Sequence, residues 1–287
     1  MIGLIILPRN PNITHMKKIW LPFAVSIFTA FTFVACKKDA TTPVQNEEIS
    51  QATLSKIKEL GFGTSNIRKV DEGYLVEGDI VLTDELLSSS PNQSLLRIAN
   101  NEQYRTTNLV DQLPRTITIS VSGLGTAYVQ GADLAISRYN ALGLQLHFQR
   151  ITSGKGDIDI VGFNQPPSGG YITLGSSGFP SRRGEPYSQV KMNTNQYAYG
   201  SNPDVKYVGS VIQHELGHCI GFRHTDYMDR SYSCGGAYAN EGASNIGAIL
   251  IPGTPSGPDA NSWMLACSNG GDRTFNNNDK TALNYLY

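Results

Sequence analysis

The sequence predicts an α+β fold, in which helices pack against a twisted mixed sheet. The first observation is a strand–helix–strand–strand succession between residues 116 and 163, where the spacing of apolar side chains alternates between two-residue and helical periods. The second is a long helical segment at residues 205–222. The third is a glycine-rich, irregular stretch at residues 231–272, which precedes a short C-terminal helix. The 287 residues accommodate one domain of moderate size and a smaller segment.

The first 36 residues have the composition of an export signal. Two lysines follow Met16, residues 19–35 are apolar, and Cys36 precedes a polar tether. The order Phe-Val-Ala-Cys resembles the lipobox of bacterial lipoproteins, whose cysteine is lipidated. We therefore expect Met16 to be the true start and Cys36 to anchor the protein in the bacterial cell envelope, on its periplasmic or surface face. The alternatives are an ordinary signal peptide with secretion and an uncleaved membrane anchor.

Residues 37–104 are expected to form a tether and a small folded unit. The tether, residues 37–47, is polar and typical of a flexible linker. Apolar side chains at helical spacing predict a helix over residues 48–60 that ends at Gly61. Two strands are then expected over residues 66–70 and 74–82, followed by a loop at residues 88–112.

The main domain is expected to span residues 105–287. Its predicted strands cover residues 116–122, 144–151 and 157–163, with a backing helix over residues 126–142. A further segment, residues 188–194, alternates like an edge strand of the same sheet. The last helix lies within residues 277–287, where Asn277 or Asn278 is the expected N-cap.

The composition is typical of a loop-rich exported protein. Charged residues make up 16% of the chain and the formal net charge is −1, which excludes the basic surface of a nucleic-acid-binding protein. Three cysteines follow Cys36, and in an exported chain one pair of them forms a disulfide. Spacing does not select the pair. Our working expectation is Cys234–Cys267, with Cys219 as a small buried helix residue. A monomer is presumed.

The stretch VIQHELGHCIGFRHTD, residues 211–226, holds three of the chain's five histidines. His214 and His218 stand four residues apart and therefore share one helix face, where both imidazoles can reach the same ion. Gly221 can end that helix in the left-handed conformation and turn the chain back, which would bring His224 in as a third ligand. Glu215 lies beside this point, where it could take a proton from a water molecule.

Three protein ligands leave the fourth tetrahedral position open, which is typical of a catalytic zinc site. A chain of this composition would contain H-E-x-x-H-x-x-G-x-x-H by accident in about one case in 10⁵. The sequence therefore predicts one Zn²⁺ held by His214, His218 and His224, with Glu215 as the catalytic residue. Calcium is not indicated. His147 alternates with apolar strand residues and is expected to be structural.

These residues resemble the metzincin zinc endopeptidases, and among them the astacins and the bacterial HEIGH dual-action metallopeptidases. The resemblance implies a metzincin-like domain with a backing helix, a zinc-site helix, a Met-turn and a C-terminal helix. It makes Met264, 40 residues after His224, the Met-turn methionine, which forms an apolar floor and does not bind the metal. The pair Asp229-Arg230 and the C-terminal ALNYLY also match the astacin pattern.

The chain departs from the astacins at two positions. Thr225 stands where they have a glutamate after the third histidine, and Ala266 stands where they have a metal-binding tyrosine. Tyr227, Tyr232 and Tyr238 remain candidates for that tyrosine. The departures favour the HEIGH group, although its fixed motif reads H-E-L-G-H here.

The resemblance also implies a role for Asp79. Astacin prosegments carry F-x-G-D-I, whose aspartate binds the zinc and keeps the enzyme latent, and residues 76–80 read V-E-G-D-I. A carboxylate is a competent zinc ligand. The alternative is that Gly78-Asp79 forms only a turn between two strands. The sequence from residue 37 to the main domain contains no cysteine, so a cysteine switch is excluded.

The implied activity is that of an exported zinc endopeptidase, made as an aspartate-switch zymogen, which acts on protein or peptide substrates. A substrate is expected to lie extended along residues 188–194, as an added strand. The alternatives are a surface binding lipoprotein with an inactive site, a structural zinc protein, and a zinc amidase that acts on cell-wall peptides. The intact Glu215 argues against the first of these, and the open fourth position against the second.

Overall fold

A computed structural model describes residues 49–88, 103–168, 170–238, 248–255 and 257–287. The chain divides into two compact units, residues 1–46 and 47–287, and all described residues belong to the second. The predicted signal, its lipobox cysteine Cys36 and the tether lie outside the described residues. Within the described ranges, no helix combines the length and the apolar composition that a membrane span requires.

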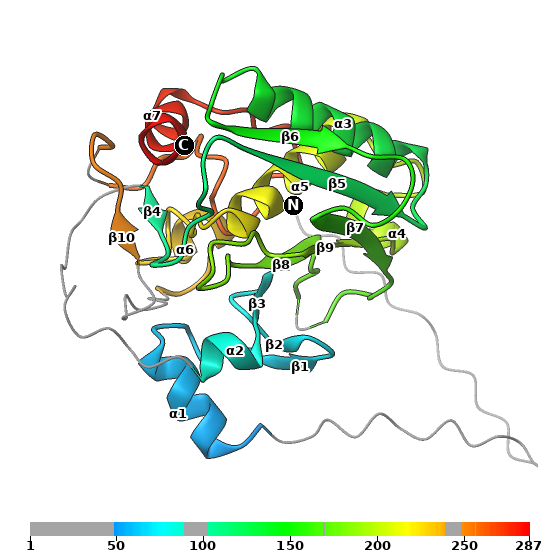
Figure 1. Ribbon diagram of the computed structural model, residues 1–287. Helices are drawn as coiled ribbons and strands as arrows, with labels where there is room; N and C mark the ends of the chain where they lie inside the picture. Colours follow the sequence, from blue (N-terminus) through cyan, green and yellow to red (C-terminus); the bar gives the residue numbers. More distant parts are fainter. Residues whose placement is uncertain (1–48, 89–102, 169, 239–247, 256) are drawn as a thin grey trace, which may run out of the picture. The chain divides into compact units, whose positions relative to one another are not determined.

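The described residues form a mixed sheet with the strand order β1-β2-β3-β8-β9-β7-β5-β6 (Figure 1). Four of these strands run parallel, namely β5 (Arg115–Ser122), β6 (Leu146–Arg150), β7 (Ile158–Phe163) and β9 (Gln189–Asn193). Strand β8 (Gly175–Gly178) pairs antiparallel with β9. The predicted α+β class is therefore confirmed.

Two long helices, α3 (Thr126–Asn140) and α5 (Val205–Cys219), pack against each other and against this sheet (Figure 1). Glycines allow a close crossing, because a Cβ atom on Gly131 would lie 2.9 Å from Val208 Cγ1. Helix α5 begins at the N-cap Asp204, whose side chain accepts a hydrogen bond from the Tyr207 amide. It ends before Gly221, which has the left-handed φ of 109° that glycine adopts without a Cβ clash.

The leading segment, residues 49–88, contains α1 (Gln51–Glu59), β1 (Arg68–Val70), β2 (Gly73–Val76), β3 (Ile80–Leu82) and α2 (Asp84–Leu87). Strand β3 pairs parallel with β8, so the leading segment continues the sheet of the main domain. Its apolar cluster, which includes Leu60, Phe62 and Ile80, also contains Phe179 from just beyond β8.

The single strand predicted for residues 74–82 is wrong. The chain turns back within it, and β2 and β3 form an antiparallel hairpin in which Val76 pairs with Ile80. The hairpin tip consists of Glu77, Gly78 and Asp79, with a positive φ of 56° at Glu77 and 98° at Gly78. Apolar residues flank the tip on both sides, so the alternating pattern continued across a turn that only Gly78 marks.

The prediction that residues 188–194 form an edge strand is also wrong. Strand β9 lies between β7 and β8, and β8 has the sequence Gly-Ser-Ser-Gly, which carries no apolar alternation. Short elements also interrupt the stretches that were expected to be irregular. They are α4 (Gln196–Tyr199), α6 (Ser231–Cys234) and a small sheet of β4 (Tyr104–Arg105) with β10 (Ile249–Leu250).

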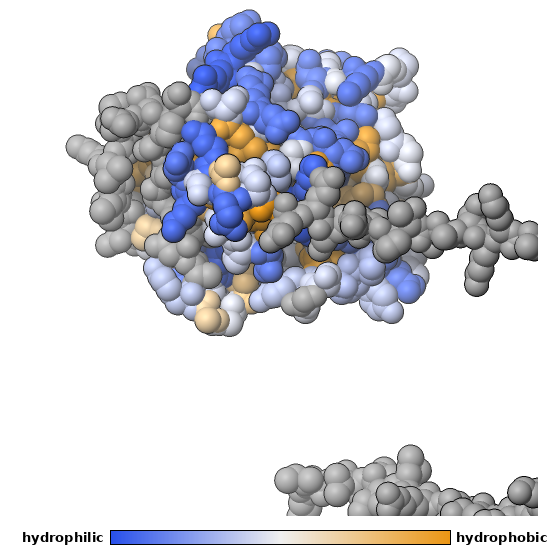
Figure 2. All heavy atoms as spheres, turned by 90° about the horizontal axis from the view of Figure 1, so that it is seen from below, coloured by the Kyte–Doolittle hydropathy of each residue, from blue (hydrophilic) through white to orange (hydrophobic). Residues whose placement is uncertain are grey.

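The C-terminal helix α7 (Asn277–Leu286) has a different N-cap from the predicted one. Asn276 caps it, and its side chain forms a reciprocal capping box with Asp279. The expected disulfide Cys234–Cys267 is present, and Cys219 is a buried free thiol of α5. On the face seen in Figure 2, polar residues surround small, separate apolar areas.

Candidate metal centre

Helix α5 and the turn after it place three imidazoles around one point. His214 and His218 lie on one face of α5, and the turn at Gly221 returns the chain so that His224 faces them. The ring centroids lie 4.7 to 5.4 Å apart, and the side chains are buried. The three histidines predicted from the sequence motif are therefore brought together by the fold. His147, by contrast, is exposed on β6.

Backbone carbonyls orient two of the three rings. His214 Nδ1 lies 2.9 Å from the Trp263 carbonyl oxygen, and His218 Nδ1 lies 2.8 Å from that of Phe222. A carbonyl oxygen only accepts hydrogen bonds, so each Nδ1 carries the proton and donates it. The lone pair of each ring is then on Nε2, which faces the other histidines. This is the usual arrangement of imidazoles that bind a metal.

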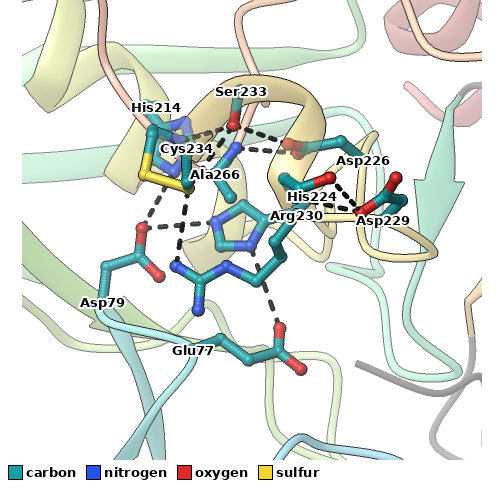
Figure 3. Close-up of a disulfide and its surroundings, with 12 residues drawn as sticks. Glu77, Asp79, His214, His224, Asp226, Asp229, Arg230, Ser233, Cys234 and Ala266 are labelled. Atoms are coloured by element: carbon teal, nitrogen blue, oxygen red, sulfur yellow. Dashed lines mark hydrogen bonds and ion pairs between the residues drawn. A yellow bond between two sulfur atoms is a disulfide. The ribbon is translucent and has the colours of Figure 1, made fainter. Parts of the chain in front are cut away.

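The carboxylate of Asp79 completes the group. Asp79 Oδ2 lies 3.2 Å from His224 Nε2 and 3.4 Å from His214 Nε2 (Figure 3). His218 Nε2 lies 3.2 Å from His224 Nε2. Ligand atoms about 2.0–2.1 Å from a tetrahedral zinc would lie roughly 3.3–3.4 Å from one another. Ligand atoms of all four side chains lie within 4.8 Å of one another. The donor set and its spacing therefore fit a zinc ion.

Two polar atoms in this group have no hydrogen-bond partner among the described residues. They are His214 Nε2 and Asp79 Oδ1, and both are buried. Buried polar atoms are rarely left unsatisfied, so their convergence at one point favours a bound cation. Burial opposes the ionisation of Asp79, but the charge of His224 and the neighbouring imidazoles of His214 and His218 outweigh it and hold the pKa of Asp79 well below its usual value.

Glu215 is buried next to the histidines and is held by Ser177 of β8. The Ser177 hydroxyl donates to Glu215 Oε2 at 2.6 Å. Burial, reinforced by the charge of Asp79, raises the pKa of Glu215 well above its ordinary value. Gly175 makes room for this side chain, because a Cβ atom there would lie 2.7 Å from Glu215 Oε1. The Glu215 side chain is thus held in place by contacts with two residues of β8.

Met264 is fully buried, and its role as the Met-turn methionine remains a prediction. Helix α5 approaches it at Gly217, where a Cβ atom would lie 2.4 Å from Trp263 Cη2 and 2.7 Å from Met264 Sδ. The Met264 carbonyl accepts a hydrogen bond from the Thr225 amide, which joins the Met-turn to the residue after His224.

The three tyrosine candidates lie in different surroundings. Tyr227 is buried and packs edge-on against Tyr104, with its ring centroid 4.4 Å away. Tyr232 is 44% exposed and Tyr238 is 69% exposed. The amide of Ala266, which stands at the astacin tyrosine position, donates to Asp226 and joins the Met-turn to the loop after His224.

A cleft of about 530 Å³ leads to the centre. The residues along it include His214, Glu215, Asp79, Tyr171 and Arg230. Sequence reasoning missed Ser177 and Gly175, because a Gly-Ser-Ser-Gly stretch has no pattern that indicates a strand beside a catalytic site. It also missed Arg223, which lies between two residues of the motif and pairs with Glu77 of the leading segment.

The family comparison agrees with this geometry. Residues 74–287, well over half of the chain, match the family described as dual-action HEIGH metallo-peptidase. The chain belongs to this metallopeptidase family. The match begins within β2 and includes the hairpin tip, so the predicted domain boundary at residue 105 remains a prediction.

Other comparisons are more distant. One solved structure of myroilysin is 12% identical, with a TM-score of 0.42, and the alignment covers 63% of this chain and 95% of that one. A second myroilysin crystal structure is 14% identical, with a TM-score of 0.39, and covers 68% of this chain and 93% of that one. No curated protein sequence matches the chain significantly.

Proposed function

We propose that this metallopeptidase is a zinc endopeptidase with Glu215 as its general base. The observation that carries the proposal is the convergence of three Nε2 atoms beside a buried, hydrogen-bonded carboxylate. His214, His218 and His224 would hold the ion. When bound, zinc supplies a Lewis acid that lowers the pKa of water toward 7 and polarises a carbonyl.

The chain's own residues supply the proton transfers. Glu215 takes a proton from the attacking water and delivers it to the amine that leaves when the peptide bond breaks. Ser177 holds the Glu215 carboxylate in place, and Gly175 leaves space for it. Without the leading segment, β8 would be an edge strand of the sheet. The peptide would lie along β8 and add a strand to this sheet.

We also propose that the leading segment is a prosegment that keeps the enzyme latent. Two observations support this. Asp79 offers a ligand atom to the same point as the three histidines, where it would compete with a substrate carbonyl or water, and β3 pairs with the edge of β8. The turn alternative for Gly78-Asp79 and the latency role are compatible, because the turn is what directs Asp79 toward the histidines.

The test of the peptidase proposal combines metal analysis with peptide cleavage. The full chain is purified, activated by limited trypsin digestion and incubated with a peptide library and, separately, with peptidoglycan. We expect about one zinc per chain and cleavage of peptides, and we expect Glu215→Gln to keep the zinc and lose turnover. Cleavage of peptidoglycan alone would show the amidase instead. Zinc binding without any hydrolysis would favour a binding protein.

Export and lipidation are a further part of the proposal. The disulfide Cys234–Cys267 supports an oxidising compartment. Radiolabelled palmitate should enter the wild-type chain in bacterial cells and not a Cys36→Ser variant. Incorporation that is equal in the two proteins would contradict the anchor.

A further inference from the structure

Arg223 is a fully buried cation immediately before the third histidine. Its Nη2 donates to Glu77 Oε1 at 2.9 Å and to Glu77 Oε2 at 3.1 Å. Its Nε and Nη1 have no hydrogen-bond partner among the described residues. A buried arginine is costly unless a carboxylate pairs with it, so this position requires an anionic partner.

The groups that cover the guanidinium come largely from the leading segment. Phe62 stacks on it with 4.5 Å between Arg223 Cζ and the ring centroid, and Glu77 supplies the carboxylate. The main domain contributes the ring of Tyr227 at 5.5 Å. If the leading segment departs, Arg223 loses its counter-ion Glu77 and the ring of Phe62, and its guanidinium lies at the bottom of an open pocket.

This pocket lies next to the metal centre. Glu77 Oε2 is 3.8 Å from His224 Nδ1, while Asp79 Oδ2 is 3.2 Å from Nε2 of the same ring (Figure 3). The two carboxylates of the hairpin tip therefore lie on the two sides of one imidazole. A peptide whose reacting carbonyl takes the place of Asp79 can thus direct a side chain from a nearby residue toward Arg223.

We propose that Arg223 forms a carboxylate-binding subsite, now filled by Glu77, which makes this enzyme prefer substrates with an Asp or Glu close to the cleaved bond. The inference rests on the proposed peptidase function and adds the substrate class. The planar guanidinium matches a carboxylate, and its unpaired Nε and Nη1 offer further donors. A role only in anchoring the leading segment is the competing explanation, and it predicts no preference in peptides.

The test compares matched peptides on trypsin-activated full-length protein. Each pair is identical except for Glu or Gln at one position flanking the cleaved bond. We expect kcat/KM to be about 10-fold or more higher for the Glu peptide at one position, because a hydrogen bond to a charged partner is stronger than one to a neutral partner. Ratios within twofold at every position would overturn the inference. Cleavage of no peptide at all would overturn the proposed function, and the inference with it.

Variants then assign the preference to Arg223. Arg223→Gln should reduce the Glu-to-Gln ratio to about one, while Arg223→Lys should retain part of the ratio. The matched control is Arg182→Gln, an exposed arginine beyond β8, which should leave the ratio unchanged. A preference that survives in Arg223→Gln would overturn the assignment. If Arg223→Gln loses its zinc or its fold, Arg223→Lys decides the assignment, and a Glu-to-Gln ratio equal to that of the wild type would overturn it.

Discussion

Replacement of Asp79 by alanine should make the uncleaved chain active. The Asp79 side chain is only 13% exposed, and its Oδ2 lies 3.2 Å from His224 Nε2 and 3.4 Å from His214 Nε2. Alanine removes these contacts and leaves β3 and the apolar cluster of the leading segment in place. The leading segment should therefore stay folded and lose only its hold on the metal centre.

The size of the effect follows from the contacts that are lost. A hydrogen bond to a charged group contributes about 1.5–3 kcal/mol, which corresponds to a change of about 10- to 150-fold in the fraction of molecules with an open centre. A bound metal would strengthen the contact further, so this range is a lower limit. We expect the uncleaved Asp79→Ala protein to hydrolyse a fluorogenic peptide at least about 10 times faster than the uncleaved wild type.

The assay follows fluorescence and chain length together, so that activity is assigned to uncut protein. The matched control is Asp71→Ala, which changes an exposed aspartate in the turn between β1 and β2. That variant should stay as latent as the wild type. Equal rates for uncleaved Asp79→Ala and wild type, when trypsin activates both, would refute the reasoning from the geometry of the metal centre.

Three further predictions concern stability. Gly217→Ala should lower the free energy of unfolding by about 1–3 kcal/mol, because the added Cβ would lie 2.4 Å from Trp263 Cη2. This clash should outweigh the higher helix propensity of alanine, and urea unfolding measures the result. Burial raises the pKa of Asp279 from 3.8 to about 7, so the folded state holds a proton that the unfolded state has released, and stability is lost as pH rises through this range. In the wild type, the free energy of unfolding should fall by roughly 2–3 kcal/mol between pH 5 and pH 8 because of this group, and Asp279→Asn should abolish that fall. Replacing both Cys234 and Cys267 by serine should cost about 3–4 kcal/mol, the chain-entropy value for a loop closed over a sequence separation of 33, as thermal or urea unfolding would show.

Each of these predictions has its own control. Gly125→Ala adds a Cβ where no atom lies within 4 Å, so a loss of stability as large as that of Gly217→Ala would contradict the steric argument. A pH dependence that is unchanged in Asp279→Asn would assign the titration to other groups. For the disulfide, the wild type in reductant should match the double variant, and a double variant as stable as the oxidised wild type would contradict the predicted cost.

The parts of the site that could be predicted from the sequence are those set by local geometry. His214 and His218 are separated by one helical turn, and a turn at Gly221 can return His224 to the same point, so the spacing alone indicates the group. Met264 and Asp79 could be proposed only by resemblance. Their approach to the histidines depends on a hairpin and a long loop whose paths no local pattern specifies.

The features that were missed depend on contacts between distant segments. Strand β8 consists of glycine and serine, and it is a strand because β9 and β3 pair with it on both sides. Residues 188–194 were predicted to be an edge strand because their neighbour β8 has no apolar alternation and so could not be recognised as a strand. The pair of Glu77 and Arg223 joins residues 146 positions apart, and a charged residue in either place would ordinarily be expected at the surface.

The three-residue tip between β2 and β3 has a consequence for the time course of maturation. Both of its acidic side chains, Glu77 and Asp79, belong to one short turn between paired strands, so they should leave the domain together. A protease that cuts the chain after α2 does not displace that turn, because β3 remains paired with β8. If the leading segment is a prosegment, as proposed, hydrolysis therefore begins only when the hairpin separates from β8, and it should follow the cut after a measurable lag.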